Sequence, residues 1–472
     1  MDREKYLILL KSFILLSPLP FGCVGKIFSP LFYMLLLTLS FIGINYADKP
    51  VKIKLNRTKF IYEKRAIKIF YILLGFLLFQ SIPLPVSFLK IISPGSIKAL
   101  TELKDTLPFF YTISQVPVET IIFTLQIIVM AAFFWSFVNI KLKKFEMFSI
   151  INTLILSASL QSFFGLIKYS TGSEYFFLFF HKIKIYPESP FLTGTLGNPD
   201  HFAFYLEMII PLILANIFLK IKFLDAGSHF KDKMISAFNQ ERNFIIYFVL
   251  LVLAAVAIIL TGARSGILTL VLSFLIFSLL SYYLKKTRMI RKKLKVIFIV
   301  IAVAAVFIGI QNTTEKFMTT SFESSGRFLR WPNSMNMAYD FPIFGTGFGT
   351  YKYSFFCYDT DPGGKWSTHA HNEYIETLTD GGIVGTIILL SLFGILIASI
   401  FKMWISRKHP EIKIMGIGIL TGIFAVSIHS FFDFSLRIPS NLFVFILLLA
   451  LGIQLATYKR EVTEDSIKRE KF

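Results

Sequence analysis

The side chains best suited to chemistry lie in one polar stretch between residues 327 and 385. This stretch holds two arginines, Arg327 and Arg330, and two histidines, His369 and His371, among carboxylates and glycines. A histidine can exchange a proton near neutral pH, and arginine binds phosphate groups through planar, permanently charged donors. These residue types predict a site where a base deprotonates a hydroxyl beside a bound phosphate group.

Three arginines are candidates for binding a diphosphate. Arg327 and Arg330 are three residues apart, so a helical turn from Gly326 to Trp331 would place both on one face. Arg264 stands in the sequence TGARSG, a tight turn where two apolar helices meet. The alternative for each is an arginine that is solvated at the surface or reaches the lipid headgroups with its charged end.

Two histidines and three carboxylates follow one another in the sequence THAHNEYIETLTD. His369 and His371 alternate, so they share a face in an extended segment and point apart on a helix. Either imidazole could serve as a general base. Glu373, Glu376 or Asp380 could orient that imidazole, and the alternative is that they are ordinary solvated carboxylates.

Charged and polar residues also lie near the ends of three apolar segments. In the run TGTLGNPDHFA, Asn198 or Asp200 could cap the helix that follows, and the exposed amides of that helix end could bind an anion. Glu207, deeper in the same helix, is an unusual charge for an apolar segment. We expect Asp433 to pair with Arg437 after the penultimate apolar segment.

Two motifs in the polar stretch resemble well-known binding sequences without their context. Asp359-Thr-Asp361 has the form of a metal and sugar-nucleotide motif, but such a triplet is frequent by chance. Gly345, Gly347 and Gly349 resemble part of a dinucleotide loop, but no βαβ unit surrounds them. We interpret these glycines as turn residues that bring the chain close to the membrane.

The composition is that of a polytopic membrane protein. Of 472 residues, 54% are hydrophobic, 54 are Phe, and the mean hydropathy is +0.65. Windows long enough to cross about 30 Å of hydrocarbon fall near residues 6–24, 27–46, 69–92, 117–139, 148–168, 201–220, 243–261, 265–284, 296–311, 383–401, 412–429 and 439–457. We therefore predict an all-α fold with about twelve transmembrane helices and a large external loop, residues 312–382, between the ninth and tenth.

The basic residues indicate how the chain is oriented. If the N-terminus is cytoplasmic, the inside segments hold 34 Lys and Arg residues and the outside segments hold 12. Basic residues accumulate on the cytoplasmic side of membrane proteins. Both termini are then cytoplasmic and the polar stretch is external. The net charge of +20 reflects this topology and interaction with membrane lipids, so we expect no nucleic-acid partner.

The order of these motifs resembles the O-antigen ligase and O-antigen polymerase superfamily of bacterial envelope glycosyltransferases. The main feature is His371-Asn372, followed after nine residues by Gly382-Ile-Val-Gly385. The runs RFLRW, PIFGTGFGTY, TGARSG and GNPDHFA add to the resemblance, which covers roughly residues 193–440. The chain departs from the protein-glycosylating branch in having Asn198-Pro-Asp200 where that branch often has Gln-Pro-Asn.

The resemblance implies a glycosyltransferase of the C type at the outer face of the bacterial inner membrane. It would move a glycan from an undecaprenyl-diphosphate carrier to an acceptor such as lipid A-core, without metal, nucleotide or other cofactor. His371 would be the catalytic base, and Arg264 with Arg327 or Arg330 would bind the diphosphate. The supporting residues we expect around them are Asn372, Glu373, His369, Asn198 and Asp200.

The resemblance also suggests a division of the chain and a set of alternatives. We expect N-terminal transmembrane helices in residues 1–192, a ligase-like core in residues 193–440, and a last helix with a cytoplasmic tail in residues 441–472. A repeat-unit polymerase and a protein O-oligosaccharyltransferase share much of the pattern with an O-antigen ligase. The alternative that is not an enzyme is a transporter.

Overall fold

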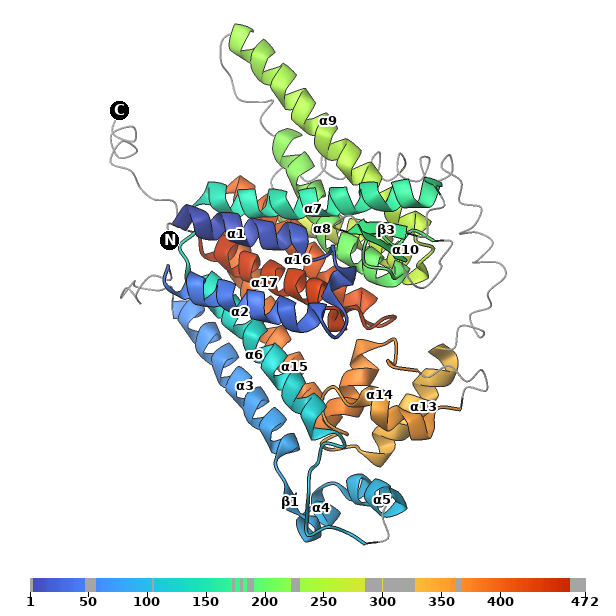
Figure 1. The fold of residues 1–472 in the computed structure, drawn as a ribbon. Coiled ribbons are helices and arrows are strands. Elements are labelled where there is room, and N and C mark those ends of the chain that lie inside the picture. The colour runs from blue at the N-terminus through green and yellow to red at the C-terminus, as the bar shows by residue number, and fades with distance from the viewer. Residues whose placement is uncertain are drawn as a thin grey trace.

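The computed structural model is built almost entirely of helices (Figure 1). It describes residues 3–46, 57–103, 106–171, 175–178, 181–184, 191–221, 230–284, 299, 327–360 and 367–458. The elements up to residue 184 are α1 (Arg3–Leu16), η1 (Phe21–Cys23), α2 (Phe28–Ile44), α3 (Arg57–Ser81), β1 (Leu84–Pro85), α4 (Val86–Ile92), α5 (Pro94–Leu103), β2 (Phe110–Tyr111), α6 (Pro117–Asn139), α7 (Lys144–Thr171), β3 (Tyr175–Leu178) and β4 (His181–Lys184).

The later elements carry most of the predicted site. They are α8 (Pro199–Ile221), α9 (Phe230–Leu260), α10 (Arg264–Leu280), η3 (Ser281–Tyr283), α13 (Arg327–Asp340), α14 (Tyr351–Ser354), η4 (Phe355–Tyr358), α15 (Glu373–Ile405), α16 (Pro410–His429), η5 (Ser435–Arg437) and α17 (Pro439–Thr457).

Eight of the twelve predicted windows are helices long and apolar enough to cross a membrane. Within the described residues these candidate spans are Pro117–Asn139, Lys144–Thr171, Pro199–Leu219, Asn243–Leu260, Arg264–Tyr283, Glu373–Ile405, Pro410–His429 and Pro439–Thr457. The prediction of a polytopic helical membrane protein is confirmed. The count of twelve is not, and the window 296–311, apart from residue 299, and the first part of the predicted loop lie outside the described residues.

Two of the other three windows differ from the helices they contain because prolines end those helices early. The window 6–24 includes Pro18 and Pro20, and α1 stops at Leu16 after 14 residues. The window 69–92 includes Pro83 and Pro85, and α3 stops at Ser81. Proline removes a backbone donor and disfavours helix in the residue before it. The remaining window, 27–46, forms the 17-residue apolar helix α2.

Two short antiparallel ribbons interrupt the otherwise helical fold. In the first, β1 pairs with β2, and Leu84 lies opposite Tyr111. In the second, β3 pairs with β4, and Tyr175 lies opposite Lys184. The all-α prediction therefore misses these two small ribbons.

The core of the bundle forms around α8, in which residues 201–219 are all buried. Helices α9, α10, α16 and α17 pack against it. One hydrophobic cluster joins α8 to these helices and to α1, α2, α6 and α7. A fully buried apolar helix is typical of the centre of a large membrane bundle.

Helix α15 has two parts with different surroundings, separated by a kink. Residues 373–382 are mostly buried, whereas only 17% of the most apolar 18-residue segment of the helix is buried. The kink lies at Gly382, whose φ of 59° and ψ of −169° are conformations that side chains other than glycine avoid. The second part packs along α3 and exposes apolar side chains such as Ile383 and Ile387. The first part belongs to the polar end of the molecule.

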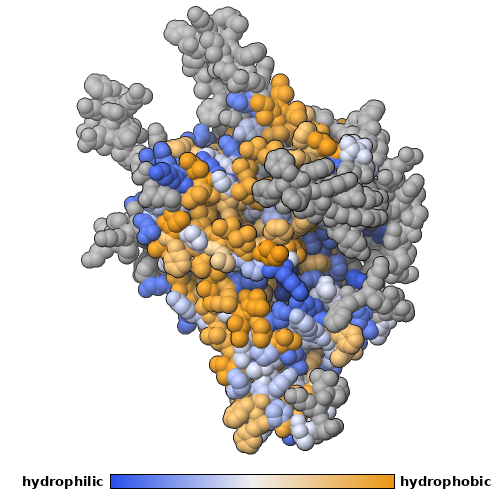
Figure 2. Space-filling view, in the orientation of Figure 1, coloured by the Kyte–Doolittle hydropathy of each residue, from blue (hydrophilic) through white to orange (hydrophobic). Residues whose placement is uncertain are grey.

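The surface reflects this separation. Figure 2 shows apolar residues over the face where Figure 1 places α2, α3 and α6, and hydrophilic residues gathered towards α13 and α14. Apolar surface of this extent on a chain with eight candidate spans is where lipid would contact the protein.

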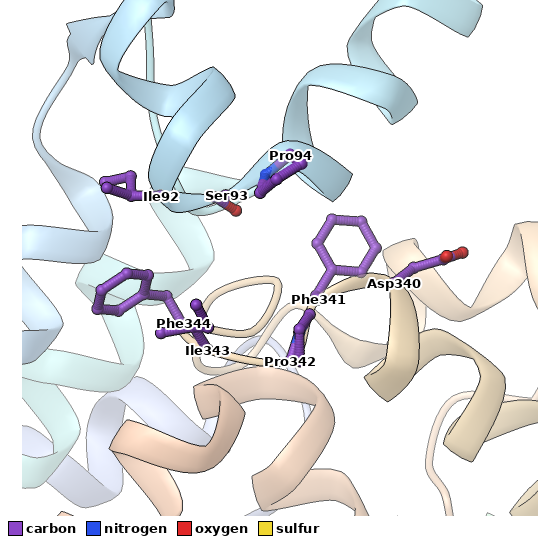
Figure 3. A pocket seen from close by; sticks show the side chains of 8 residues that line it. All are labelled: Ile92, Ser93, Pro94, Asp340, Phe341, Pro342, Ile343 and Phe344. Carbon is purple, nitrogen blue, oxygen red and sulfur yellow. The ribbon is translucent and has the colours of Figure 1, made fainter.

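The end of α13 meets the turn between α4 and α5 at a small pocket (Figure 3). Its lining consists of Ile92, Ser93, Pro94, Asp340, Phe341, Pro342, Ile343 and Phe344. The two segments come so close that a Cβ on Gly95 would lie 2.1 Å from the carbonyl oxygen of Asp340. This contact holds the segment that leads into the glycine-rich turn at residues 345–349.

Candidate functional site

The predicted base His371 lies just before the first turn of α15. Asn372 is the N-cap of that helix, and its side-chain oxygen accepts hydrogen bonds from the backbone amides of Tyr374 at 3.0 Å and Ile375 at 3.1 Å. His371 has a φ of 51°, which is uncommon for a residue other than glycine and costs of the order of 1 kcal/mol. Such a conformation persists only where the surrounding contacts fix it.

The contact that fixes His371 is with Asp433, in the turn between α16 and α17. The Nδ1 atom of His371 lies 3.1 Å from Oδ1 of Asp433, whose side chain is fully buried. Burial raises the pKa of a carboxyl group, but His201 and the hydrogen bond from His371 lower the pKa of Asp433 well below its ordinary range. An ionised carboxylate only accepts hydrogen bonds, so Nδ1 of His371 must be the donor.

The other oxygen of Asp433 is also occupied. Ser435 donates a hydrogen bond to Oδ2, and Nε2 of His201 lies 3.5 Å from the same oxygen. Asp433 thus faces two imidazoles, one from the start of α15 and one from the start of α8. The predicted pairing of Asp433 with Arg437 is wrong, because His371 and Ser435 occupy the two oxygens of Asp433.

His369 has a different carboxylate partner from His371. Its Nδ1 atom lies 2.9 Å from Oε1 of Glu376, and the other oxygen of Glu376 accepts a hydrogen bond from the backbone amide of Ala370 at 3.0 Å. The ring of Phe434 lies between the histidines. Its centroid is 4.0 Å from that of His369, 4.8 Å from that of His371 and 4.9 Å from that of His201.

The three carboxylates of α15 surround Arg437 instead of orienting His371. The guanidinium lies 3.3 Å from Glu373, 3.6 Å from Glu376 and 3.5 Å from Asp380. Burial lowers the pKa of a guanidinium, but these carboxylates raise the pKa of Arg437 above its ordinary value, so it stays charged. Glu373 therefore pairs with Arg437 and accepts a hydrogen bond from the backbone of Leu436 at 3.0 Å.

The glycine-rich turn at residues 345–349 packs against the kink of α15. Gly345, Gly347 and Gly349 all have positive φ, as expected for turn glycines. The amide of Gly347 donates to the backbone oxygen of Asp380, and that of Gly349 donates to the side chain of Asp380, both at 2.9 Å. A Cβ on Gly345 would lie 2.4 Å from the Asp380 carbonyl carbon. The turn therefore shapes the helix that carries the site carboxylates.

Arg327 and Arg330 begin α13, so the predicted helical turn is present. Nε of Arg330 donates to the hydroxyl of Ser367 at 2.7 Å, and the indole of Trp331 donates to the backbone oxygen of Ala370 at 3.1 Å. These bonds hold α13 along the segment that ends in His371. The side chain of Arg327 lies outside the described part of the chain.

Asn198 and Asp200 lie at the start of α8 and have different roles. The side-chain oxygen of Asn198 accepts from the amides of Asp200 at 2.8 Å and His201 at 3.4 Å, so Asn198 caps the helix. Asp200 accepts a hydrogen bond from Ser265 at 3.3 Å. The cap therefore presents Asp200 and His201 side by side at the helix end.

Arg264 begins α10, after the turn at Gly262, and is half-buried. Its neighbour Ser265 contacts Asp200, and the residue after Asp200 faces Asp433, the partner of His371. The first turn of α8 thus connects the predicted base to the helix end that carries the predicted diphosphate arginine.

Two elements of this arrangement were not predicted from the sequence. The partnership of His371 with Asp433 was missed because the two residues are 62 positions apart. The buried pair of Glu207 and His429, at 2.9 Å, was missed because His429 lies in an apolar run. The available signal was the charge of Glu207 within an apolar helix, since such a charge requires a partner.

The fold and the site together define a polytopic helical membrane protein with a histidine and carboxylate site at one end of its bundle. Residues 249–390 match the family model described as O-antigen ligase. This match confirms the predicted resemblance to the O-antigen ligase and polymerase superfamily. The matched segment contains Arg264, Arg330 and His371, and ends before Asp433. No curated protein matches the chain.

Proposed function

We propose that the protein moves a glycan from an undecaprenyl-diphosphate carrier to an acceptor hydroxyl at the outer face of the inner membrane. The family match supports a membrane enzyme of the O-antigen ligase and polymerase type. Within that type we propose an O-antigen ligase with lipid A-core as acceptor, on the spacing from His371-Asn372 to Gly382 and Gly385. Metal-independent, inverting transfer is part of the proposal.

The observation that carries this proposal is the geometry of His371. Its Nδ1–H is held by Asp433, and its Nε2 has no hydrogen-bond partner among the described residues. The side chain is 25% exposed, so a substrate can reach it. A fixed donor at Nδ1 leaves Nε2 as the proton acceptor, which is the arrangement required of a general base.

The proposed step forms one bond and breaks one. The acceptor oxygen attacks the anomeric carbon of the carrier-bound sugar while Nε2 of His371 takes the hydroxyl proton. The bond between that carbon and the diphosphate oxygen breaks, and its electron pair leaves with undecaprenyl diphosphate. The attack comes from the side opposite the leaving group, so the configuration at the anomeric carbon inverts.

The arginines are proposed to stabilise the departing diphosphate. Charge on the leaving group grows in the transition state, and fixed cationic donors are most effective where charge develops. Two contacts support this role: Ser265, next to Arg264, donates to Asp200 at the start of α8, and Arg330 donates to Ser367, four residues before His371. Arg327, on the turn before Arg330, remains a further candidate.

The test is transfer by the purified protein from a lipid-linked glycan donor, comparing the wild type with His371→Ala. We expect a loss of about 10²- to 10⁴-fold in kcat, the usual contribution of a general base. His409→Ala is the matched control, because His409 adjoins the opposite end of α16 from the site. Near-normal transfer by correctly inserted His371→Ala protein would refute the mechanism.

A deletion strain separates the other branches of the superfamily, and the purified protein tests the transporter alternative. A deletion strain with uncapped lipid A-core would indicate a ligase, single-repeat lipopolysaccharide a polymerase, and unglycosylated protein an oligosaccharyltransferase. Transport of solute across proteoliposomes without glycan transfer would indicate a transporter.

A further inference from the structure

A chain of hydrogen bonds extends from Arg264's helix into the buried part of the bundle. The hydroxyl of Ser265 lies 3.3 Å from Oδ1 of Asp200 and 3.3 Å from Nε2 of His429. Nδ1 of His429 lies 3.0 and 2.9 Å from the two oxygens of Glu207. His429 and Glu207 are 0% and 1% exposed, so this pair is buried where α8, α10 and α16 pack together.

The hydrogen-bonding capacity of these groups fixes the direction of the chain. Glu207 accepts at both oxygens, so Nδ1 of His429 is the donor. Ser265 has one hydroxyl proton, which it donates to Asp200. Nε2 of His429 must then donate to the Ser265 oxygen. With this assignment, a His429 ring protonated on both nitrogens would balance the charge of Glu207, which is costly at this depth without a partner.

The first turn of α10 depends on this chain because it has no side-chain cap of its own. The N-cap residue is Ala263, which makes no side-chain hydrogen bond to the helix. Gly266 allows α8 to pack closely, since a Cβ there would lie 2.8 Å from that of Ala203 and 3.3 Å from Glu207. The side chain of Ser265 ties this turn to both neighbouring helices through Asp200 and His429.

We propose that Ser265, His429 and Glu207 are positioning residues that fix the first turn of α10 and thereby aim Arg264 at the donor diphosphate. This inference rests on the proposed function. It assigns a role to the buried pair, which does not reach the reacting atoms. It also explains the residue types in the TGARSG turn. Gly262 allows the turn, Gly266 allows close packing against α8, and Ser265 holds the turn in place.

The test measures binding of undecaprenyl diphosphate to the purified protein alongside glycan transfer. Ser265→Ala should weaken binding and raise the donor KM about tenfold, the effect of losing about one net hydrogen bond, with kcat and the acceptor KM within twofold of wild type. Ser273→Ala, two turns deeper on α10, is the matched control. The hydroxyl of Ser273 is buried and has no hydrogen-bond partner among the described residues. The Ser273→Ala protein should therefore bind undecaprenyl diphosphate with wild-type affinity.

A double-mutant cycle shows whether Ser265 acts through Arg264. If it does, Ser265→Ala should weaken binding no further once Arg264→Ala is present, whereas a general loss of structure would add to it. Glu207→Gln, which keeps the shape of the side chain, is the second variant and should also raise the donor KM.

Wild-type affinity in both variants, or full additivity with Arg264→Ala, would overturn the proposal. Failure of the wild type to transfer glycan despite binding the lipid diphosphate would refute the proposed function instead.

Discussion

Replacing Asp433 with asparagine is the sharpest test of the site, because it removes one charge and almost no volume. The carboxylate now accepts from His371 at one oxygen and from Ser435 at the other. An asparagine can offer an oxygen on one side only. If its NH₂ group faces Nδ1 of His371, Nδ1 must become the acceptor and the proton moves to Nε2. The imidazole then cannot accept a proton from the substrate.

The size of the effect follows from this change of tautomer. A general base contributes about 10²- to 10⁴-fold, and loss of the correct tautomer in a comparable histidine and carboxylate pair costs about 10⁴-fold. We therefore expect Asp433→Asn to lower kcat by about 10²- to 10⁴-fold, or roughly 3 to 5.5 kcal/mol in activation free energy. The donor KM should change little, since Asp433 is buried behind the base.

The assay is single-turnover transfer from a lipid-linked glycan donor in proteoliposomes. Ser435→Ala is the control, because it removes the second bond to Asp433 and leaves the charge and the bond to His371 in place; it should retain kcat within about tenfold. An Asp433→Asn protein that folds normally and keeps kcat within threefold of wild type would refute the assignment of His371 as a base oriented by Asp433.

Three further predictions concern stability and pH. Gly382→Ala should destabilise the protein by about 3 kcal/mol or more, measured as a lower thermal midpoint, because the φ of Gly382 is positive and a Cβ would lie 2.3 Å from the oxygen of Ile343. Gly394→Ala on the same helix, where a Cβ meets nothing within 4 Å, is the control and should be neutral. Equal thermal midpoints for the two variants would contradict this prediction. Arg437→Met should cost about 3–5 kcal/mol by leaving the α15 carboxylates without their cation, and a midpoint within 1 °C of wild type would show that another group neutralises them. Because the pKa of Asp433 is lowered, its ionised form stabilises the folded state above the ordinary Asp pKa of about 3.9, and this contribution is lost as pH falls through the lower pKa of the folded state. The difference in thermal midpoint between wild type and Asp433→Asn should therefore not shrink from pH 8 to pH 5 and should shrink only below about pH 4.

The sequence predicted the elements of this fold better than their ends. Eight apolar windows matched candidate spans because membrane helices are long and apolar. The errors at α1 and α3 arose where hydropathy continued through prolines that end a helix. The polar stretch was correctly identified as rich in turns, since the positive φ of Gly345 and Gly347 confirms their interpretation as turn residues.

The site was predicted residue by residue but not as a set of pairs. Local rules identified the capping role of Asn198 and the helical turn at Arg330, because both depend on neighbours in the chain. The partner of His371 could not be found this way. The sequence suggested Glu373, Glu376 or Asp380 for this role, and only the folded packing of α15 against the turn after α16 selects Asp433.

The ring of Phe434 has a consequence for how protons are distributed near the substrate. A hydrocarbon ring that contacts all three imidazoles cannot carry a proton between them, so it separates His369, which pairs with Glu376, from His371 and His201, which share Asp433. His369 contacts Glu376 and His371 contacts Asp433, so the two imidazoles have different carboxylate partners. A polar side chain of similar size in place of Phe434 would connect His369 and His371 through hydrogen bonds. His371 would then lose its proton to His369 instead of returning it to the reaction.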